Sequence, residues 1–530
     1  MDNVWGNNVH KWSRLRTGIA ALLALALVAA ACGGDDDDTD DGAVDAAADI
    51  DPAGVLRLGA DLTLPQSGQF DPISVDVLLS TTHEFLYGTL YRMTPEGEAE
   101  PDLAEEVTIV DSSTLTVELR DGLTFTDDTP LDAEALKFSW ERALQQSKAG
   151  GLEAEFREIE SLTVTSPLVL TVKLKQPIAG AFFRLLRLAE TSPVSPTAVR
   201  AGVDFNKTPV GAGPFKLVSY QPGVATRFEK NPDYWNADAI KIAGIEYVNV
   251  TAQALTNAVR SSTIDFASLN AVQARELQQV PGYAIENEPS NDINLLGFWC
   301  KSKPPFDNLK VRQAINYGID KDEINVAAYD GKGEEMAGFH SSVSPFYNED
   351  LKGYYEYDPD KAKELLAEAG VPNLAFDMFF QPGDGQIATE VMQAQLARIG
   401  VKVTLKALAN VTDFFPNATG APIFVAPLPR SGIQKVTRLL VPGSFGNVCN
   451  WDDPELTGMA RRLQGIDETS AEGVELWHKL SENLMENALH LLGVWGTSGY
   501  TYNEGRLGGI ELYDGRSSRT LDIQKVFVKK

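Results

Sequence analysis

The sequence predicts an α/β protein of two or three domains, with an extra subdomain built onto the first of them. Three observations lead to this prediction. Residues 1–31 have the pattern of a cleaved leader, and the 499 residues that follow, of 530, are too long for a single hydrophobic core. Residues 115–174 contain short strands with alternating apolar side chains. Residues 358–405 instead alternate helix and strand patterns, which is typical of a parallel or mixed sheet with covered faces.

The N-terminal segment is interpreted as a targeting signal. Lys11, Arg14 and Arg16 form a basic region, and residues 19–31 are an apolar run that is shorter than the roughly 20 residues needed to span a bilayer. The sequence AAAC at 29–32 resembles a bacterial lipobox. That resemblance implies a lipoprotein signal peptide over 1–31 and lipidation of Cys32. The alternative is ordinary secretion with cleavage at another position.

An acidic tether follows the signal at residues 32–51. It contains four consecutive aspartates, Asp35 to Asp38, and almost no large apolar side chain, so it is expected to be disordered. Residues 1–31 carry three basic side chains and one acidic side chain, which leaves 43 basic against 73 acidic residues in the mature chain. Such a surface repels phosphates, and we therefore expect no nucleic-acid partner.

The first lobe is expected to begin with a strand at 55–62, a polar loop at 63–72 and a helix through Phe85 and Leu86. Residues 115–144 then read as two short strands around Asp121-Gly122, followed by a helix that Asp132 caps. Asp127 and Asp128 could be a catalytic carboxylate pair, but a turn and capping role is favoured because no base lies near them in the sequence. Residues 94–195 are expected to form the subdomain.

Residues 209–235, PVGAGPFKLVSYQPGVATRFEKNPDYW, predict a β-hairpin. Pro214 stands where a strand begins, a position that tolerates proline, and Gln221-Pro222-Gly223 supplies the turn. Asn231-Pro232 ends the return strand before Tyr234 and Trp235.

Three blocks of this chain together resemble one family. They are the hairpin at 209–235, the strand–turn–helix block at 115–144, and the run PPFDNLKVRQAINYGID at 304–320. They are similar to the corresponding stretches of the family 5 solute-binding proteins, the peptide- and nickel-binding class that feeds ATP-binding-cassette importers. The resemblance covers most of residues 52–500, with the family domain itself expected at about 98–450.

The resemblance implies a type II periplasmic-binding-protein fold, in which two hinged lobes close on a ligand like a Venus flytrap. Lobe I is then expected at 52–300 and 497–530, and lobe II at 301–496, with crossings near Cys300 and Trp495. The implied partners are a permease and an ATPase of an importer. We expect a monomer that is lipid-anchored on the extracytoplasmic face of the cell membrane, without a cofactor or a metal.

Lobe II itself has clear helix and strand signals. Asp358 and Pro359 are a good helix start, and an apolar stripe runs from Ala362 until Gly370 ends the helix. Residues 376–380 form a strand, 387–399 a helix and 401–405 another strand. A last long helix through Trp477 leads into a strand at 489–495 that returns to lobe I.

Two cysteines remain if Cys32 is lipidated. Cys300 and Cys449 would then share an oxidising compartment, so we predict a disulfide between them. Two separate buried thiols are the alternative, and the sequence leaves both open.

Catalytic signatures are missing from the sequence, which contains no P-loop, no G-x-S-x-G, no H-E-x-x-H and no C-x-x-C. The mature chain has four histidines, His83, His340, His478 and His490, and no pair has metal-ligand spacing. A binding protein is therefore favoured over an extracytoplasmic hydrolase on a two-lobed scaffold, which requires a dispersed triad. A lipoprotein that senses a ligand is a third hypothesis.

The ligand residues are implied by the resemblance. Peptide-binding relatives pair the ligand's amine with an aspartate in lobe II, and Arg430 in APIFVAPLPR (421–430) aligns roughly with it. An arginine prefers a carboxylate or phosphate, so an anionic ligand is predicted. The alternative is that Arg430 lies on a solvent-facing loop. The full set of candidate ligand-binding residues is Gln66, Ser67, Thr82, Phe298, Gln381, Arg430, Phe445 and Trp451.

Overall fold

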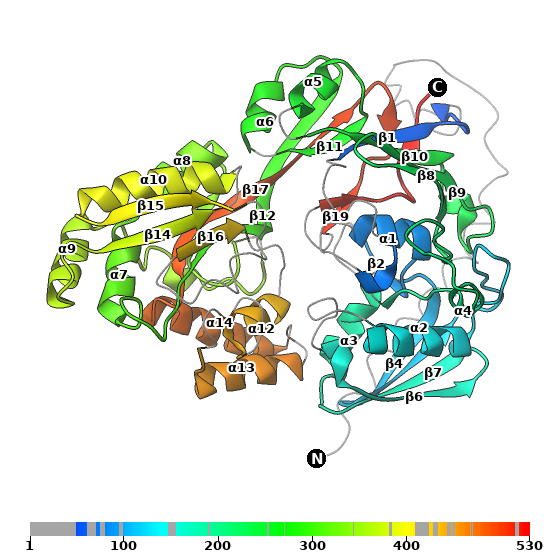
Figure 1. The fold of residues 1–530 in the computed structure, drawn as a ribbon, viewed down its shortest axis with the longest axis horizontal. Helices are drawn as coiled ribbons and strands as arrows, with labels where there is room; N and C mark the ends of the chain where they lie inside the picture. Colours follow the sequence, from blue (N-terminus) through cyan, green and yellow to red (C-terminus); the bar gives the residue numbers. More distant parts are fainter. Residues whose placement is uncertain are drawn as a thin grey trace, which may run out of the picture. The chain divides into compact units, whose positions relative to one another are not determined.

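The computed structural model of the protein describes residues 49–60, 70–74, 80–94, 99–146, 155–188, 191–251, 254–269, 271–342, 344–380, 384–408, 423–427, 433–442, 447, 451–466, 468, 470–514 and 519–530. They belong to one compact unit, Asp49–Lys530, drawn in Figure 1. The predicted signal peptide, the lipidation site Cys32 and nearly all of the tether lie outside the described residues.

One sheet of 11 strands runs through this unit and confirms the α/β class. Its path is β15 (Lys402–Ala407), β14 (Ala375–Phe380), β16 (Ile423–Pro427), β12 (Tyr283–Phe298), β17 (Leu491–Asn503), β11 (Phe266–Leu269), β1 (Val55–Ala60), β10 (Gly244–Asn249), β9 (Ala225–Lys230) and β8 (Phe215–Gln221), with β13 (Glu334–Glu335) paired to β17 outside it. Figure 1 shows β12 and β17 side by side at its centre.

These two long strands connect two separate hydrophobic cores. β12 and β17 pair in antiparallel register from Tyr283↔Asn503 to Gly297↔Leu491, and the register is irregular between Pro289 and Asn294. The first part of β12 pairs with the end of β17, next to the strands of lobe I. The last part of β12 pairs with β16 of lobe II. The chain therefore passes from one core to the other through β12 and comes back through β17.

The lobe I core gathers buried side chains from Leu56 to Phe266 and from Tyr500 to Val528. The lobe II core gathers those from Phe298 to Trp495. The lobe boundaries expected from the sequence, at 300/301 and 496/497, stay a prediction, and the two cores divide the chain within a few residues of them. A smaller core lies around α5 (Leu255–Arg260) and α6 (Ala271–Leu277).

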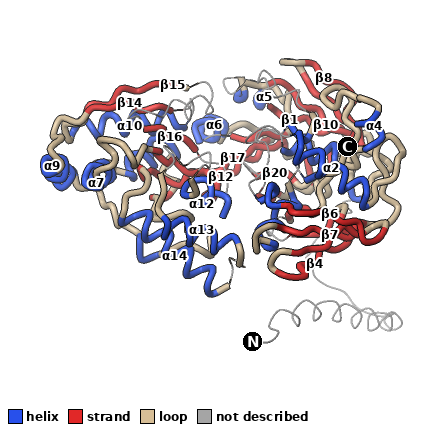
Figure 2. Tube along the Cα trace, turned by 60° about the horizontal axis from the view of Figure 1, so that its bottom comes forward, coloured by secondary structure: helices blue, strands red, loops and turns tan. Residues whose placement is uncertain are grey.

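Within lobe I, a second sheet of four strands forms a distinct part of the structure, in the order β4-β5-β7-β6. Figure 2 shows β4, β6 and β7 side by side. Trp140 is fully buried beside Phe156 and Phe182, with ring centroids 5.5 and 5.8 Å away. The elements of this part are β4 (Ala104–Asp111), β5 (Thr114–Leu119), α2 (Ala133–Gln146), η6 (Glu155–Glu158), β6 (Ile159–Ser166), β7 (Val169–Leu174), α3 (Ala179–Phe183), η7 (Arg184–Arg187) and α4 (Pro196–Arg200).

Asp127 and Asp132 have the turn and capping roles expected for them. Asp132 accepts a hydrogen bond from the Ala135 amide at the start of α2, at 2.9 Å. Asp127 accepts from the hydroxyls of Ser195, at 2.6 Å, and Thr129, at 2.5 Å. These contacts hold a turn, so the structure gives Asp127 a structural role rather than a catalytic one.

The predicted hairpin is confirmed as β8 and β9, and a close contact at its entry requires glycine at position 213. A Cβ on Gly213 would lie 2.4 Å from the Phe85 carbonyl oxygen, at the end of α1 (Ser80–Tyr87). The hairpin therefore packs directly on the backbone of α1. The end of the hairpin is held by Asp102, which accepts from Tyr234 Oη at 2.6 Å and Trp235 Nε1 at 2.7 Å.

Lobe II has the predicted α/β pattern, since β14 pairs in parallel with both β15 and β16. Asp358 caps the helix that begins at Pro359, and Gly370 has a positive φ of 73°. The helices are α7 (Leu309–Tyr317), α8 (Lys321–Tyr329), α9 (Pro359–Glu368), α10 (Asp384–Arg398), α12 (Ile433–Leu440), α13 (Pro454–Gln464) and α14 (Ala471–Glu486). Figure 1 shows α12, α13 and α14 grouped together, apart from α8 and α10.

The remaining strands are short. They are β2 (Tyr91–Met93), β3 (Ala99–Pro101), β18 (Leu507–Gly508), β19 (Leu512–Asp514), β20 (Arg519–Leu521) and β21 (Phe527–Val528). After β17, Leu507, Val526 and Val528 are buried in the same core as the residues of lobe I.

Candidate functional site

The candidate site is the interface between the two cores. On one side it is bounded by β12 and β17. At a second place the turn after α13 contacts lobe I, where Gln464 Nε2 lies 2.9 Å from Glu155 Oε1 and Arg184 Nη1 lies 3.1 Å from Glu468 Oε1. A solute held between the lobes would lie between these two boundaries.

A group of basic side chains is buried in lobe II directly after β12. Lys301 has 5 % of its surface exposed, and its ammonium lies 4.8 Å from the ring centroid of Trp451. His490, at the start of β17, is 1 % exposed and lies edge-on to Phe298, 5.5 Å between ring centroids. Lys301 makes no ion pair with any described residue. The two acids that follow Trp451 have other partners, since Asp452 accepts from the Thr457 hydroxyl and Asp453 caps α13.

Burial sets the protonation of this group. Desolvation, followed by the charge of Arg312, lowers the pKa of Lys301 to about 7. Burial also lowers the pKa of His490 well below its usual value, and the charge of Lys301 adds to that effect. His490 is therefore a neutral imidazole at neutral pH. An anion beside Lys301 would favour its charged form, because an opposite charge offsets the desolvation cost.

Arg312 is the third base, but its guanidinium is occupied. It donates to the carbonyl oxygens of Phe306, at 2.7 Å, Ala488, at 3.1 Å, and Asn487, at 2.9 Å. Arg312 belongs to the VRQA part of the third family block. Its role here is to tie α7 to the chain between α14 and β17.

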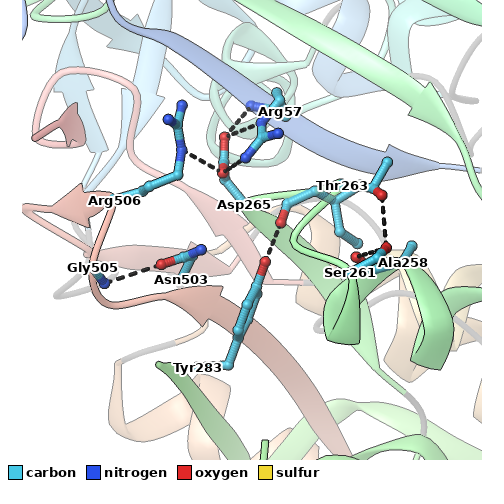
Figure 3. Close-up of polar contacts among 10 residues, drawn as sticks. Arg57, Ala258, Ser261, Thr263, Asp265, Tyr283, Asn503, Gly505 and Arg506 are labelled. Carbon is cyan, nitrogen blue, oxygen red and sulfur yellow. Dashed lines mark hydrogen bonds and ion pairs between the residues drawn. The ribbon is translucent and has the colours of Figure 1, made fainter. Parts of the chain in front are cut away.

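A second charged cluster lies in lobe I (Figure 3). Like Arg312, its side chains have a structural role. Asp265 is fully buried and accepts from the Arg57 amide at 3.0 Å, from Arg57 Nη2 at 2.5 Å and from Arg506 Nε at 2.8 Å. The hydrogen bond to Asp265 is the largest of the effects that raise the pKa of Arg57. Because Asp265 joins β1, β11 and the chain after β17, it fixes lobe I where β17 enters it.

The structure tests only some of the predicted ligand residues. Gln66, Ser67, Gln381, Arg430 and Phe445 lie outside the described residues. Trp451 is half-buried and contacts Lys301.

Two other predicted ligand residues are buried, and their ligand role stays a prediction. Thr82 is 8 % exposed and hydrogen-bonds the side chain of Tyr247, so it belongs to the packing of α1 on lobe I. Phe298 has no exposed surface and lies in the lobe II core.

Cys300 is disulfide-bonded in this structure. Its partner lies outside the described residues, as does Cys449, so the pairing of Cys300 with Cys449 stays a prediction. Lys301 follows Cys300 directly, so this disulfide also anchors the chain beside the buried lysine.

Sequence reasoning missed Lys301 as a candidate. In the sequence, Lys301 stands between a buried strand and the PPF run. A lysine in such a position suggests an exposed loop rather than a buried site. Its neighbours Trp451 and His490 are far along the chain, so no local pattern reveals the contact.

Within the described parts of the chain, no group of three or more His, Cys, Asp or Glu side chains could hold a metal ion. Among the same residues, no helix is both long and apolar enough to cross a membrane.

Comparison with known proteins gives a consistent set of similarities. Residues 98–422 match the sequence profile of the bacterial extracellular solute-binding proteins, family 5. The glutathione-binding protein GsiB of Shigella flexneri serotype 5b is 29% identical over 363 residues, 67% of this chain and 69% of the relative.

Two solved structures show the same fold. DppA from Helicobacter pylori, a periplasmic binding protein in complex with the peptide STSA, has a TM-score of 0.76 at 21% identity, over 92% of this chain and 100% of that one. AgaA from A. tumefaciens R10, in complex with agropinic acid, has a TM-score of 0.73 at 21% identity, over 88% and 99%. This chain therefore has the type II periplasmic-binding-protein fold.

Proposed function

Because the chain belongs to the bacterial extracellular solute-binding proteins, family 5, we propose that it captures a small peptide-like solute with an anionic group between its two lobes. It is a substrate-binding protein of an ABC importer that acts outside the cytoplasm, with the permease and ATPase of that importer as its partners. The observation that carries the proposal is the pair β12 and β17, about which two separately packed lobes can rotate.

The ligand class is supported by chemistry on both sides. GsiB is named as a glutathione-binding protein, and AgaA was solved with agropinic acid. Glutathione carries more carboxylates than amines, so it is a peptide-like anion. On the side of the protein, Arg430 follows β16, and Lys301 is a buried base without an acidic partner among the described residues. Arginine and lysine both recognise carboxylates.

The remaining proposals concern the membrane anchor, the oligomeric state, the disulfide and the absence of catalysis, metal and cofactor. It is held at the membrane by a lipid on Cys32 through the acidic tether, works as a monomer, and joins Cys300 to Cys449. It is a transport protein and not an enzyme, and it uses no metal and no cofactor. The family match and the solute-binding relatives support the transport role in this description.

The experiment is a thermal-shift and calorimetric screen with a defined panel: reduced glutathione, unmodified di- to pentapeptides, agropinic acid and nickel–histidine. A ligand at 100 times its Kd adds about 2.7 kcal/mol to the stability of the protein. We expect glutathione or agropinic acid to bind and plain peptides to bind more weakly. Tight binding of plain peptides alone would contradict the anionic ligand, and turnover of any panel member would contradict a pure binding role.

A further inference from the structure

We propose that the turn between α13 and α14 is a latch that holds the two lobes closed at a place separate from β12 and β17. The latch consists of Gln464, Gly465 and Glu468 of lobe II, with Glu155, Pro177 and Arg184 as their lobe I partners. This inference rests on the proposed function, because a latch matters only for lobes that open and close.

Each half of the latch is anchored in its own core. On the lobe II side, Leu463 is fully buried in the lobe II core, and Ser470 caps α14. On the lobe I side, Phe156 and Phe182 are fully buried in the lobe I core. The contacts therefore join two bodies that each pack without them. Their lobe I residues lie in η6, in η7 and just before α3, and Figure 1 labels α3 and α13.

Two polar contacts form the latch. Gln464 Nε2 donates to Glu155 Oε1 at 2.9 Å, and it also contacts Thr437 Oγ1 of its own lobe at 3.1 Å. Glu155 is only 4 % exposed, so its carboxylate is removed from water where the lobes meet. Arg184 and Glu468 pair at 3.1 Å with side chains 25 % and 16 % exposed. This ion pair is shielded from solvent more than an ordinary surface pair, and is therefore screened less by salt.

A glycine makes this approach of the lobes possible. A Cβ on Gly465 would lie 2.9 Å from the Pro177 carbonyl oxygen of lobe I. The φ of Gly465 is −92°, which any residue can adopt, so its own backbone does not require glycine. The space for a side chain at position 465 is limited by the backbone of lobe I. Gly458, within α13, offers a control, because a Cβ there would meet nothing within 4 Å.

The latch should increase the affinity of the protein for its ligand. If only closed lobes hold the solute fully, the apparent Kd equals the intrinsic Kd divided by the fraction of closed protein. Contacts that exist only between closed lobes raise that fraction before any ligand arrives. The latch should therefore tighten binding and slow release, without touching the ligand.

The first test is steric and needs no ligand. Solution scattering of the ligand-free protein is compared for wild type, Gly465→Ala and Gly458→Ala. We expect Gly465→Ala to have a larger radius of gyration, and Gly458→Ala to match the wild type. Equal radii for all three proteins would overturn the latch. Because no ligand is present, this result is independent of whether the proposed ligand class is correct.

The second test is a charge swap. Arg184→Glu and Glu468→Arg should each expand the ligand-free protein, and the double variant should restore the wild-type radius. Circular dichroism and thermal unfolding show that each variant is folded. With reduced glutathione as the probe, each single variant should bind about fivefold more weakly or worse, and the double variant should recover. Single variants that stay compact, or a double variant that stays expanded, would overturn the proposal. If glutathione does not bind, the ligand-free radii still decide it.

Discussion

At the scale of single residues, His490 makes the stability of the protein depend on pH. Burial and Lys301 hold the pKa of His490 well below its usual value. The unfolded chain, with a pKa near 6.5, therefore binds a proton that the folded chain does not, and stability falls as the pH drops below about 6.5. Between pH 6.5 and 5.5 the loss should be about 1 kcal/mol.

The measurement is urea unfolding at the two pH values for wild type and His490→Gln. Between pH 6.5 and 5.5, the free energy of unfolding of the variant should fall by about 1 kcal/mol less than that of the wild type. An unchanged pH dependence in His490→Gln would show that His490 is not buried as a neutral group.

Arg430 carries a prediction about the ligand. If its guanidinium binds a carboxylate of the solute, Arg430→Ala should weaken an anionic ligand by roughly 2–5 kcal/mol. Calorimetry with glutathione or agropinic acid measures this change, and Arg398→Ala, whose exposed side chain pairs with Glu323 of its own lobe, is a control. Unaltered affinity in Arg430→Ala would place Arg430 away from the ligand.

At the scale of elements, Asp102 explains why the hairpin ends in Tyr234-Trp235. Asp102 is 5 % exposed and accepts from both aromatic side chains and from the Thr89 amide. Asp102→Ala leaves the buried Tyr234 hydroxyl and the Thr89 amide without this acceptor, so it should destabilise the protein by about 2–4 kcal/mol.

Chemical unfolding of Asp102→Ala and Asp233→Ala checks this prediction. Asp233 stands next to Tyr234 in the chain, and its side chain forms an exposed ion pair with Lys216, so its loss should cost less than about 1 kcal/mol. Similar values for the two variants would contradict the role given to Asp102.

The disulfide is a further element-scale prediction. Cys300 is bonded in the structure, and we predict Cys449 as its partner. Closing a loop of this length contributes roughly 4–5 kcal/mol in the chain-entropy model. Thiol titration of the unfolded, unreduced protein should find neither cysteine free. Two free thiols would refute the pairing.

The elements were largely predictable because their signals are local. Asp132 and Asp358 cap the helices that the sequence assigned to them, and the hairpin at β8 and β9 has its turn where Pro222-Gly223 predicted it. The site was much less predictable, because it depends on distant contacts. Phe298 and Thr82 have side chains that suit a ligand, but burial in the two lobes decides their role. Lys301 became notable only through Trp451 and His490.

At the scale of the whole molecule, two cores are connected by β12 and β17 and touch again at the latch. This arrangement allows rotation about the two strands, since the register irregularity between Pro289 and Asn294 weakens the pairing between the cores. The Asp265 cluster holds β17 firmly in lobe I. Motion is therefore expected between the lobes rather than within them.

The most direct test of this account is solution scattering of the wild-type protein with and without a saturating ligand from the binding screen. We expect the radius of gyration of the protein to fall when the ligand binds. The latch closes only part of the ligand-free population, and the ligand closes the rest. A ligand that binds tightly and leaves the radius unchanged would contradict the central claim that the two lobes close on the solute.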